Sequence, residues 1–258
     1  MIRRSVLVSL ALLLAGCATQ APGPGAQVRQ ALAPTGALRA ALYVGTPTSV
    51  LSDADRRGVG YDLGRELARR LHVPYAPMIL ENNVAVQAAM KAGTADVAFT
   101  NASPERMKDM DFTGTHLAVE LGYLAGPKTA VKSLADVDRP GVRVGVTAGS
   151  SSQATLTRLY KNAKVVPTPT FDDGAAMLAA GTLDVYATNK ANLYAMGDKL
   201  PGSHVLDGNW GVERHAMGIP KGREAGLAYA RAFVADAVAT GLVKKAAARA
   251  GLRGAVEE

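Results

Sequence analysis

Cysteine is almost absent from this sequence, since Cys17 is its only example. A single cysteine excludes an internal disulfide. Aromatic residues make up only 5% of the chain, and none interleave with its basic residues. That shortage argues against nucleic-acid binding, which combines basic patches with stacked aromatics. The formal charge of +7, or +5 without Arg3 and Arg4, is interpreted as a solvated basic surface, compatible with an acidic ligand or a negative membrane surface.

The chain opens with a basic and then apolar leader. Arg3 and Arg4 precede the run from Ser5 to Ala15, which is shorter than the roughly 20 apolar residues that span a bilayer. This pattern predicts a secretory signal peptide over residues 1–16. The leader ends Leu14-Ala15-Gly16-Cys17, which resembles the lipobox of bacterial lipoproteins. The resemblance implies lipidation of Cys17 and a lipid anchor in the cell envelope or periplasm. The alternative is an ordinary signal peptide with a chance cysteine.

The next segment has little capacity to form a core. Residues 18–35 are mostly Ala, Gly, Pro and Gln, so we expect residues 17–35 to be a lipidated cysteine and a flexible tether. The folded part is expected from about Gly36 to about Arg253. That length suffices for two modest lobes that share one chain.

Two segments of the chain follow the same pattern. Residues 93–101 and 181–189 both read G-T-x-D-V-x-x-T-N, and each follows a helical stretch, at 84–92 and 172–180. The glycine of each pattern stands where a helix C-cap is expected, and the apolar residues after it fit a buried strand. Strand-like runs at 38–44 and 142–146 precede the two helices. Chance similarity between two such units is the alternative to an internal repeat.

This alternation predicts an α/β fold of two similar Rossmann-like lobes with mostly parallel sheets. We expect lobe 1 over 36–124 plus 216–258 and lobe 2 over 125–215, joined by a hinge of two crossings. Helices at 223–237 and 241–250 are expected to pack on lobe 1. Ligands of such sheets bind beyond the carboxyl ends of the strands, where Asn101 and Asn189 fall.

Five segments in order carry a family resemblance. They are Gly60-Tyr61-Asp62-Leu63, residues 93–100, Ser103-Pro104-Glu105-Arg106, Asp111-Phe112-Thr113 and residues 142–152. With Gly218 to Gly222 as a return strand, this resembles the periplasmic solute-binding proteins of polar amino-acid ABC importers, known as extracellular solute-binding protein family 3. The resemblance spans almost all of residues 36–250. It implies a type II-like periplasmic binding fold, an ABC permease as partner, and ligand binding without catalysis.

By this resemblance, Arg106 falls on the arginine that grips the ligand carboxylate, because a guanidinium fork matches two carboxylate oxygens. Asn101 and Ser103 fall near first-lobe contact positions. For Arg106 the alternative is a surface residue in the first turn of a helix. For Asn101 it is a turn-former at a strand end.

In the second lobe, the serines of Gly149-Ser150-Ser151-Ser152 open a predicted helix. Ser150 and Ser151 are candidate ligand contacts, because a helix N-terminus with hydroxyl groups binds anions. Plain N-capping is the alternative. Tyr43 follows the first strand, where the family contacts the ligand side chain.

The chain departs from the family at one position. Amino-acid binders usually place an aspartate at the second-lobe strand end for the ligand ammonium, and Asn189 stands there. We therefore expect an organic acid or an amino-acid-like anion as the ligand. Asn189→Asp is expected to move the preference toward amines. The expectation changes if a nearby carboxylate replaces the missing charge; the candidates are Glu81, Asp172, Asp173 and Glu213.

Two other functions remain open. Some proteins that resemble this family are cyclohexadienyl dehydratases, and His116 could reach the cleft to act in proton transfer. None of the four histidines stands in a hydrolase motif or at metal-ligand spacing, so we expect no cofactor, no metal and no enzyme. The third possibility is a ligand-sensing partner protein. The motifs favour the hypothesis that the protein captures a small carboxylate-bearing anion for an ABC importer.

Overall fold

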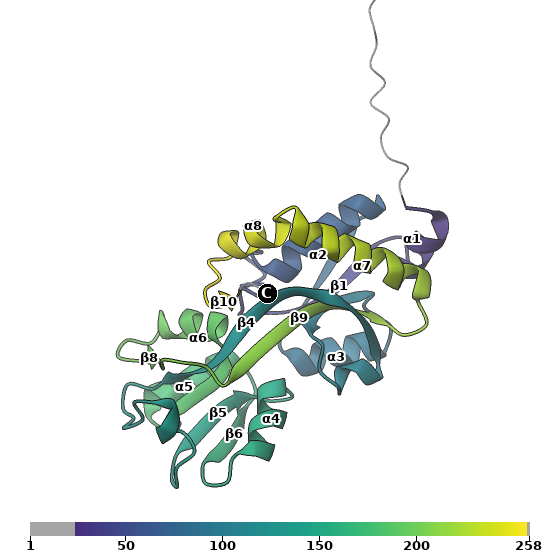
Figure 1. Cartoon of the computed structure of the whole chain (residues 1–258). Coiled ribbons are helices and arrows are strands. Elements are labelled where there is room, and N and C mark those ends of the chain that lie inside the picture. Colours follow the sequence, from purple (N-terminus) through teal and green to yellow (C-terminus); the bar gives the residue numbers. More distant parts are fainter. Residues whose placement is uncertain (1–23, 257–258) are drawn as a thin grey trace, which may run out of the picture.

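The computed structural model describes residues 24–256 of the chain (Figure 1). The predicted signal peptide, Cys17 and residues 18–23 therefore lie outside the described residues. Part of the expected tether is ordered. Helix α1 (Ala26–Leu32) packs on a C-terminal helix, α7 (Glu224–Ala239), and Leu32 is fully buried. The prediction of a flexible tether up to residue 35 is wrong for this part, because Val28, Leu32 and Ala33 supply apolar contacts that the composition understates.

Two halves of the chain repeat the same order of elements. The first half contains β1 (Leu38–Tyr43), α2 (Val59–Leu71), β2 (Tyr75–Leu80), α3 (Asn83–Lys91) and β3 (Val97–Asn101). The second half contains β5 (Arg143–Thr147), α4 (Ser151–Leu159), β6 (Lys164–Thr168), α5 (Phe171–Ala180) and β7 (Val185–Asn189). All pairings within each half are parallel, which confirms the predicted fold class. Strands β2 and β6 were not expected.

Two long strands join the halves, which we call lobe 1 and lobe 2. Strands β4 (Met110–Ala125) and β9 (Gly211–Pro220) pair antiparallel and run diagonally from one lobe to the other (Figure 1). The strand order is β2-β1-β3-β9-β4-β7-β5-β6, so one sheet is continuous through both lobes. The expected domain boundaries fall within β4 and β9, and the division into two domains stays a prediction.

The remaining elements are short or lie at the C-terminus. They are η1 (Arg106–Lys108), η2 (Leu134–Asp136), α6 (Lys190–Gly197), β8 (His204–Val205), α8 (Leu242–Arg249) and β10 (Ala255–Val256). Strand β10 pairs with β4 at the junction of the lobes, and Arg253 beside it reaches Asp198 and the Tyr194 ring of lobe 2. The C-terminal segment thus contacts both lobes.

The same arginine–aspartate ion pair occurs at the equivalent position in both lobes. In lobe 1, Asp96 accepts from the backbone N–H of Arg39 at 3.1 Å and from its Nε at 2.9 Å. In lobe 2, Asp184 accepts from the backbone N–H of Arg143 at 2.8 Å and from its Nε at 2.9 Å. Each arginine also donates Nη2 to the carbonyl of the glycine that follows α3 or α5, Gly93 for Arg39 and Gly181 for Arg143. The same contacts at both aspartates make chance similarity an inadequate account of the repeated pattern.

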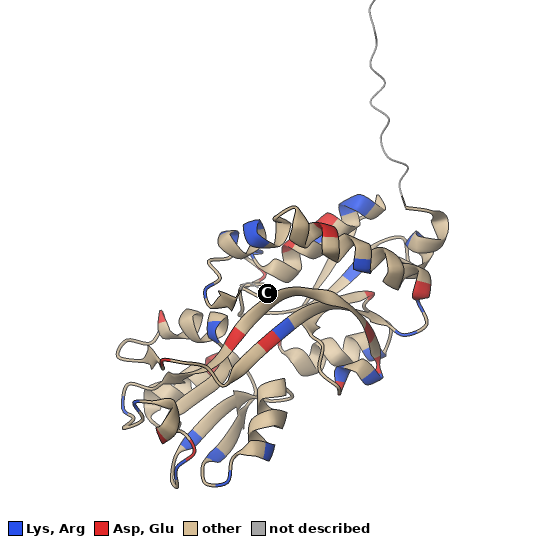
Figure 2. Ribbon diagram, viewed as in Figure 1, with Lys and Arg blue, Asp and Glu red and all other residues tan. Residues whose placement is uncertain are grey.

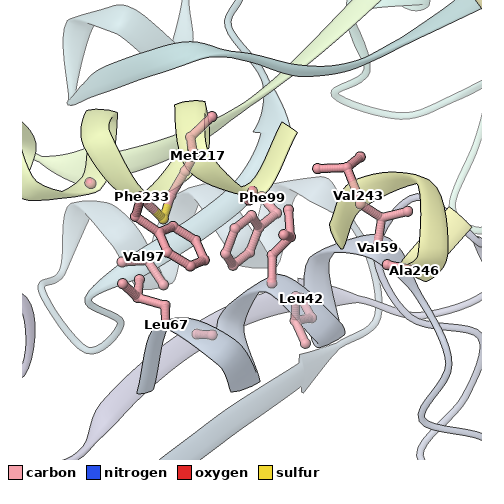
Figure 3. Close-up of a cluster of buried hydrophobic side chains, with 14 of the residues drawn as sticks. Leu42, Val59, Leu67, Val97, Phe99, Met217, Phe233, Val243 and Ala246 are labelled. Carbon is pink, nitrogen blue, oxygen red and sulfur yellow. The ribbon is translucent and has the colours of Figure 1, made fainter. Parts of the chain in front are cut away.

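The larger core belongs to lobe 1. Phe99, Met217 and Phe233 pack between α2 and α7 (Figure 3), and Val243 and Ala246 bring α8 onto the same cluster. This confirms that the two C-terminal helices pack on lobe 1. A second cluster around Val144, Val146 and Leu156 supports lobe 2.

Charged residues are interspersed over both lobes and along β4 and β9 (Figure 2). Within residues 24–256, no single helix is long and apolar enough to cross a membrane. Only α7 and α8 taken together, across a 70° bend, reach that length and composition.

Candidate functional site

A cleft opens between the two lobes at the carboxyl ends of their strands. Its volume is about 810 Å³, and it is lined from lobe 1 by the segment around Ser103 and Arg106 and from lobe 2 by the start of α4. The lobes touch at its edges. Thr46 of lobe 1 donates to Asn192 of α6, and a Cβ on Gly149 would lie 2.6 Å from Val84 of α3. Strands β3 and β7 end at Asn101 and Asn189, as predicted.

Arg106 is a buried cation that has no carboxylate beside it. The residue is 4% exposed, and its Nη1 donates to Thr100 Oγ1 at 2.7 Å and to the Asn101 carbonyl at 3.2 Å. No acidic side chain within residues 24–256 lies at ion-pair distance from it. Burial lowers the pKa of the guanidinium, and the charge of Glu213 opposes that effect. A buried cation needs a counter-charge, so the free edge of this guanidinium suits an anionic group.

Glu213 supplies a negative charge to the same region. Its side chain, on the crossing strand β9, is 13% exposed. The carboxylate accepts from Ser151 Oγ at 3.2 Å, Asn189 Nδ2 at 2.7 Å and His215 Nε2 at 3.1 Å. Burial raises the pKa of Glu213, but His215, Asn189 and Arg106 outweigh burial and lower it to about 2. The carboxylate is therefore charged at neutral pH.

Asn189 has structural partners on both sides of its amide. Its Oδ1 accepts from the Asn192 N–H and caps α6, while its Nδ2 donates to Glu213. The residue is 2% exposed. Of the four carboxylates that could replace the missing aspartate, Glu213 lies beside Asn189, and the expectation of an anionic ligand stays a prediction. The adjacent charge comes from a strand distant in sequence.

The two candidate serines of α4 differ in role. Ser150 is the N-cap, since its Oγ accepts from the Gln153 N–H at 3.1 Å. Ser151 donates to Glu213, and both serines line the cleft. Ser150 is therefore the N-cap of α4 and also lines the cleft.

The other candidates surround Arg106. Ser103 lines the cleft, and its Oγ lies 3.4 Å from the Arg106 N–H. Asn101 is buried and offers its carbonyl to the guanidinium. The Tyr43 hydroxyl pairs with Thr48 at 3.1 Å, and burial, with the charge of Glu213, raises its pKa to about 12. Their roles as ligand contacts stay predictions.

His116 lies in the interior and does not line the cleft. It packs against Phe99 and His215, and both ring nitrogens are buried without a partner. Burial, with the charge of His215, lowers its pKa to about 3. Among the described residues, no group of three metal-ligating side chains is close enough to hold a metal ion.

Glu213 and His215 are the residues that sequence reasoning underrated. Glu213 entered only as one of four carboxylates that could reach the cleft, and His215 had no assigned role. Their i, i+2 spacing on a strand places both on one face, which is a readable signal once the segment is known to be a strand. The second predicted crossing falls within this strand, but the sequence does not indicate which side chains of the crossing face the site.

Fold and site together define a two-lobed α/β protein with the type II-like fold of periplasmic binding proteins and an interlobe cleft. No model of a known protein family matches the sequence. YhdW of Escherichia coli (strain K12), provisionally named as an amino-acid ABC transporter-binding protein, is 28% identical over 180 residues, covering 64% of this chain and 51% of YhdW. The glutamine-binding protein of Geobacillus stearothermophilus is 25% identical over 117 residues, covering 45% of this chain and 44% of its own. The chain thus spans about half the length of these curated relatives.

Solved structures share the whole fold. AbpA from Streptococcus pneumoniae, an amino-acid ABC transporter substrate-binding protein bound to L-arginine, matches with a TM-score of 0.75 at 18% identity, covering 86% of this chain and 97% of that one. AncCDT-1, an ancestral amino acid-binding protein described as a precursor of cyclohexadienyl dehydratase, matches with a TM-score of 0.72 at 21% identity, covering 83% and 95%. These comparisons confirm the resemblance to family 3 solute-binding proteins.

Proposed function

We propose that this protein captures an α-amino acid outside the cytoplasm and delivers it to the permease of an ABC importer. The observation that carries this proposal is a pair of opposite charges between the lobes: Arg106, which lines the cleft, and Glu213, which accepts a hydrogen bond from the cleft residue Ser151. The pair has no net charge and suits a zwitterion better than a plain anion. Arg106 binds the ligand carboxylate, and Glu213 receives the ligand ammonium in place of the family aspartate.

The geometry supports this division of roles. Nη1 of Arg106 is held by Thr100 and Asn101, which aims the remaining donors at the cleft. The two Glu213 oxygens accept three hydrogen bonds and have about four lone-pair sites, which leaves room for an ammonium donor. A ligand between them contacts both lobes, because Ser151 of α4 lies on Glu213. Such a ligand favours the closed form by its differential affinity.

The test is a pair of charge-removing substitutions measured by isothermal titration calorimetry against a panel of amino acids. Arg106→Ala should weaken binding by about 2–5 kcal/mol, or roughly 30-fold or more. Arg106→Lys should rescue only part of the loss, because a point charge lacks the fork. Lys108→Ala is the matched control, since this exposed cation lies in the same turn and pairs with Glu105. Unchanged affinity in Arg106→Ala would refute the carboxylate role.

Glu213→Gln separates the two ends of the ligand. It should weaken binding of an amino acid and spare binding of the same acid without its amino group, because only the ammonium loses its counter-charge. Equal losses for both ligands would contradict the ammonium role. Recovery of unaltered ligand after long incubation with the protein separates capture from dehydratase chemistry.

The leader supports the location that we propose. Arg3, Arg4 and the apolar run to Cys17 fit export and attachment of the protein to a membrane by lipid. A tethered binding protein of this kind stays near its permease. A permease in neighbouring genes would favour import over the sensing alternative.

A further inference from the structure

The interlobe cleft is larger than an amino-acid backbone requires. Its volume of about 810 Å³ falls in the range in which proteins bind drug-sized ligands, about 300–1,000 Å³. The cleft also extends well beyond Arg106. It continues between α3 and α4 and is lined along the whole of α4, from Ser150 to Arg158. The ligand therefore has room for a long side chain in that direction.

Most of the α4 surface lines this extension. Ser151, Ala154, Thr155 and Arg158 recur at helical spacing, Gln153 and Thr157 flank them, and Ser152 and Leu156 are buried. Arg158 lies seven positions after Ser151, which corresponds to roughly 10 Å along the helix axis at about 1.5 Å per residue. Helical side chains lean toward the N-terminus, so the guanidinium of Arg158 leans back toward the amino-acid end of the cleft.

The charges of the lining favour a second anion at this outer end. Only Glu105, Arg106 and Arg158 are ionisable among the residues that line the cleft. Glu105 is paired with Lys108 at 2.6 Å. Arg158 makes no ion pair or hydrogen bond through its side chain with any other part of residues 24–256. A ligand carboxylate at this end therefore finds a free guanidinium.

The wall between the two arginines suits an aliphatic arm. Val84 of α3 is 52% exposed and faces the cleft opposite α4. Ala154 lies on the facing helix, and Gln87 donates its amide to Asn83 within α3. A methylene chain can cover Val84 and Ala154 without leaving a buried polar group unpaired.

We propose that Arg158 forms an outer subsite of the cleft, which binds a distal carboxylate of the ligand. The ligand is then an α-amino dicarboxylic acid whose side chain is longer than that of glutamate. This inference rests on the proposed amino-acid site at Arg106 and Glu213. Such a ligand is anionic overall, as the sequence led us to expect.

The experiment compares two ligands of equal chain length that differ in the distal group. 2-Aminosuberate ends in a carboxylate and 2-aminooctanoate ends in a methyl group. By calorimetry at low salt, the wild type should bind 2-aminosuberate about 3- to 10-fold more tightly, as expected for a partly exposed ion pair. Arg158→Gln should remove that preference. Arg139→Gln is the control, since Arg139 is an exposed arginine of lobe 2 outside the cleft, paired with Asp136.

The outcomes separate this inference from the proposed function. If the wild type shows no preference for 2-aminosuberate, or Arg158→Gln keeps it, the outer subsite does not exist as described. Binding of short amino acids with rejection of both long ligands overturns it as well. Loss of both ligands in Arg106→Ala supports the inner site independently, whereas full binding in Arg106→Ala overturns the proposed function whatever Arg158 does.

Discussion

Asn189→Asp is expected to destabilise the fold, because it places a second carboxylate beside Glu213. The new carboxylate would replace an amide whose Nδ2 lies 2.7 Å from Glu213 Oε2. Two unit charges at that distance repel by about 6 kcal/mol at an effective dielectric constant of about 20. Protonation of one of the two carboxyl groups removes this repulsion and costs about 4 kcal/mol at pH 7 for a group with an ordinary pKa near 4. The O–H of the protonated group then restores a hydrogen bond, so we expect a net loss of about 2–4 kcal/mol in the free energy of unfolding.

The pH dependence of this loss identifies its cause. The folded variant holds a proton that its unfolded chain lacks at pH 7, so its stability rises as the pH falls, by about 1.4 kcal/mol per unit toward pH 5. Wild-type Glu213 behaves oppositely. Its pKa is lowered to about 2, so its contribution is complete above the unfolded value near 4.5 and is lost as the pH falls below it. Between pH 5 and 8 this group leaves wild-type stability unchanged.

Urea unfolding followed by circular dichroism at pH 5, 6, 7 and 8 measures both effects. Asn189→Ser is the control, because serine keeps the N-cap of α6 and removes the contact with Glu213 without adding charge. Its loss should not vary over this range. If Asn189→Asp is equally destabilised at pH 5 and pH 8, the reasoning about Glu213 fails. The variant should also gain no preference for amine-bearing ligands, since its pair with Glu213 holds one proton.

Three further predictions concern the frame, the motion and the anchor. Asp96→Ala should lower the free energy of unfolding in urea by about 3–5 kcal/mol, because the fully buried Asp96 pairs with both Arg39 and Arg223. Asp184→Ala should lower it by only about 1–2 kcal/mol, because its pair with Arg143 is partly exposed. Equal losses of stability in the two variants would show that burial of the aspartate does not set its contribution. Small-angle scattering should show compaction at saturating ligand, and an unchanged radius of gyration would count against cleft closure. Cys17→Ser should release the protein from the membrane fraction or block its processing, and wild-type fractionation would contradict the lipid anchor.

The helix–glycine–strand unit that recurs in the two lobes was predictable from sequence, because the residues that determine it are close together in the chain. A helix, a left-handed glycine and a buried strand recur in the two repeated patterns, with Gly93 at φ +67° and Gly181 at φ +77°. Strands β2 and β6 were not predicted, because they contain Pro77 and Pro167, and proline within an apolar run argues against a central strand. Both are edge strands in the structure, where proline is tolerated and discourages pairing with other chains.

Arg106 was predictable from sequence, whereas the position of Glu213 was not, because it depends on contacts between residues far apart in the chain. Arg106 follows β3 within a recognisable local motif, so its place could be read directly. Glu213 meets Ser151 and Asn189 across 62 and 24 residues, through the path of β9. Helix α1 was missed for a similar reason, since its burial depends on α7 at the other end of the chain; Arg223 of that region donates to the Ala31 carbonyl.

The asymmetry of the cleft follows from a symmetric frame. The Arg39–Asp96 and Arg143–Asp184 pairs align equivalent strands in the two lobes, and the strand that follows each aspartate, β3 or β7, ends in asparagine. Different segments then follow these ends. Lobe 1 continues into the turn that buries Arg106, whereas lobe 2 caps α6 and leaves its charge to the crossing strand. The positive charge comes from one lobe and the negative charge from the crossing strand β9. If the lobes move apart as we expect, the two charges separate, so the zwitterion that we propose as ligand would oppose opening.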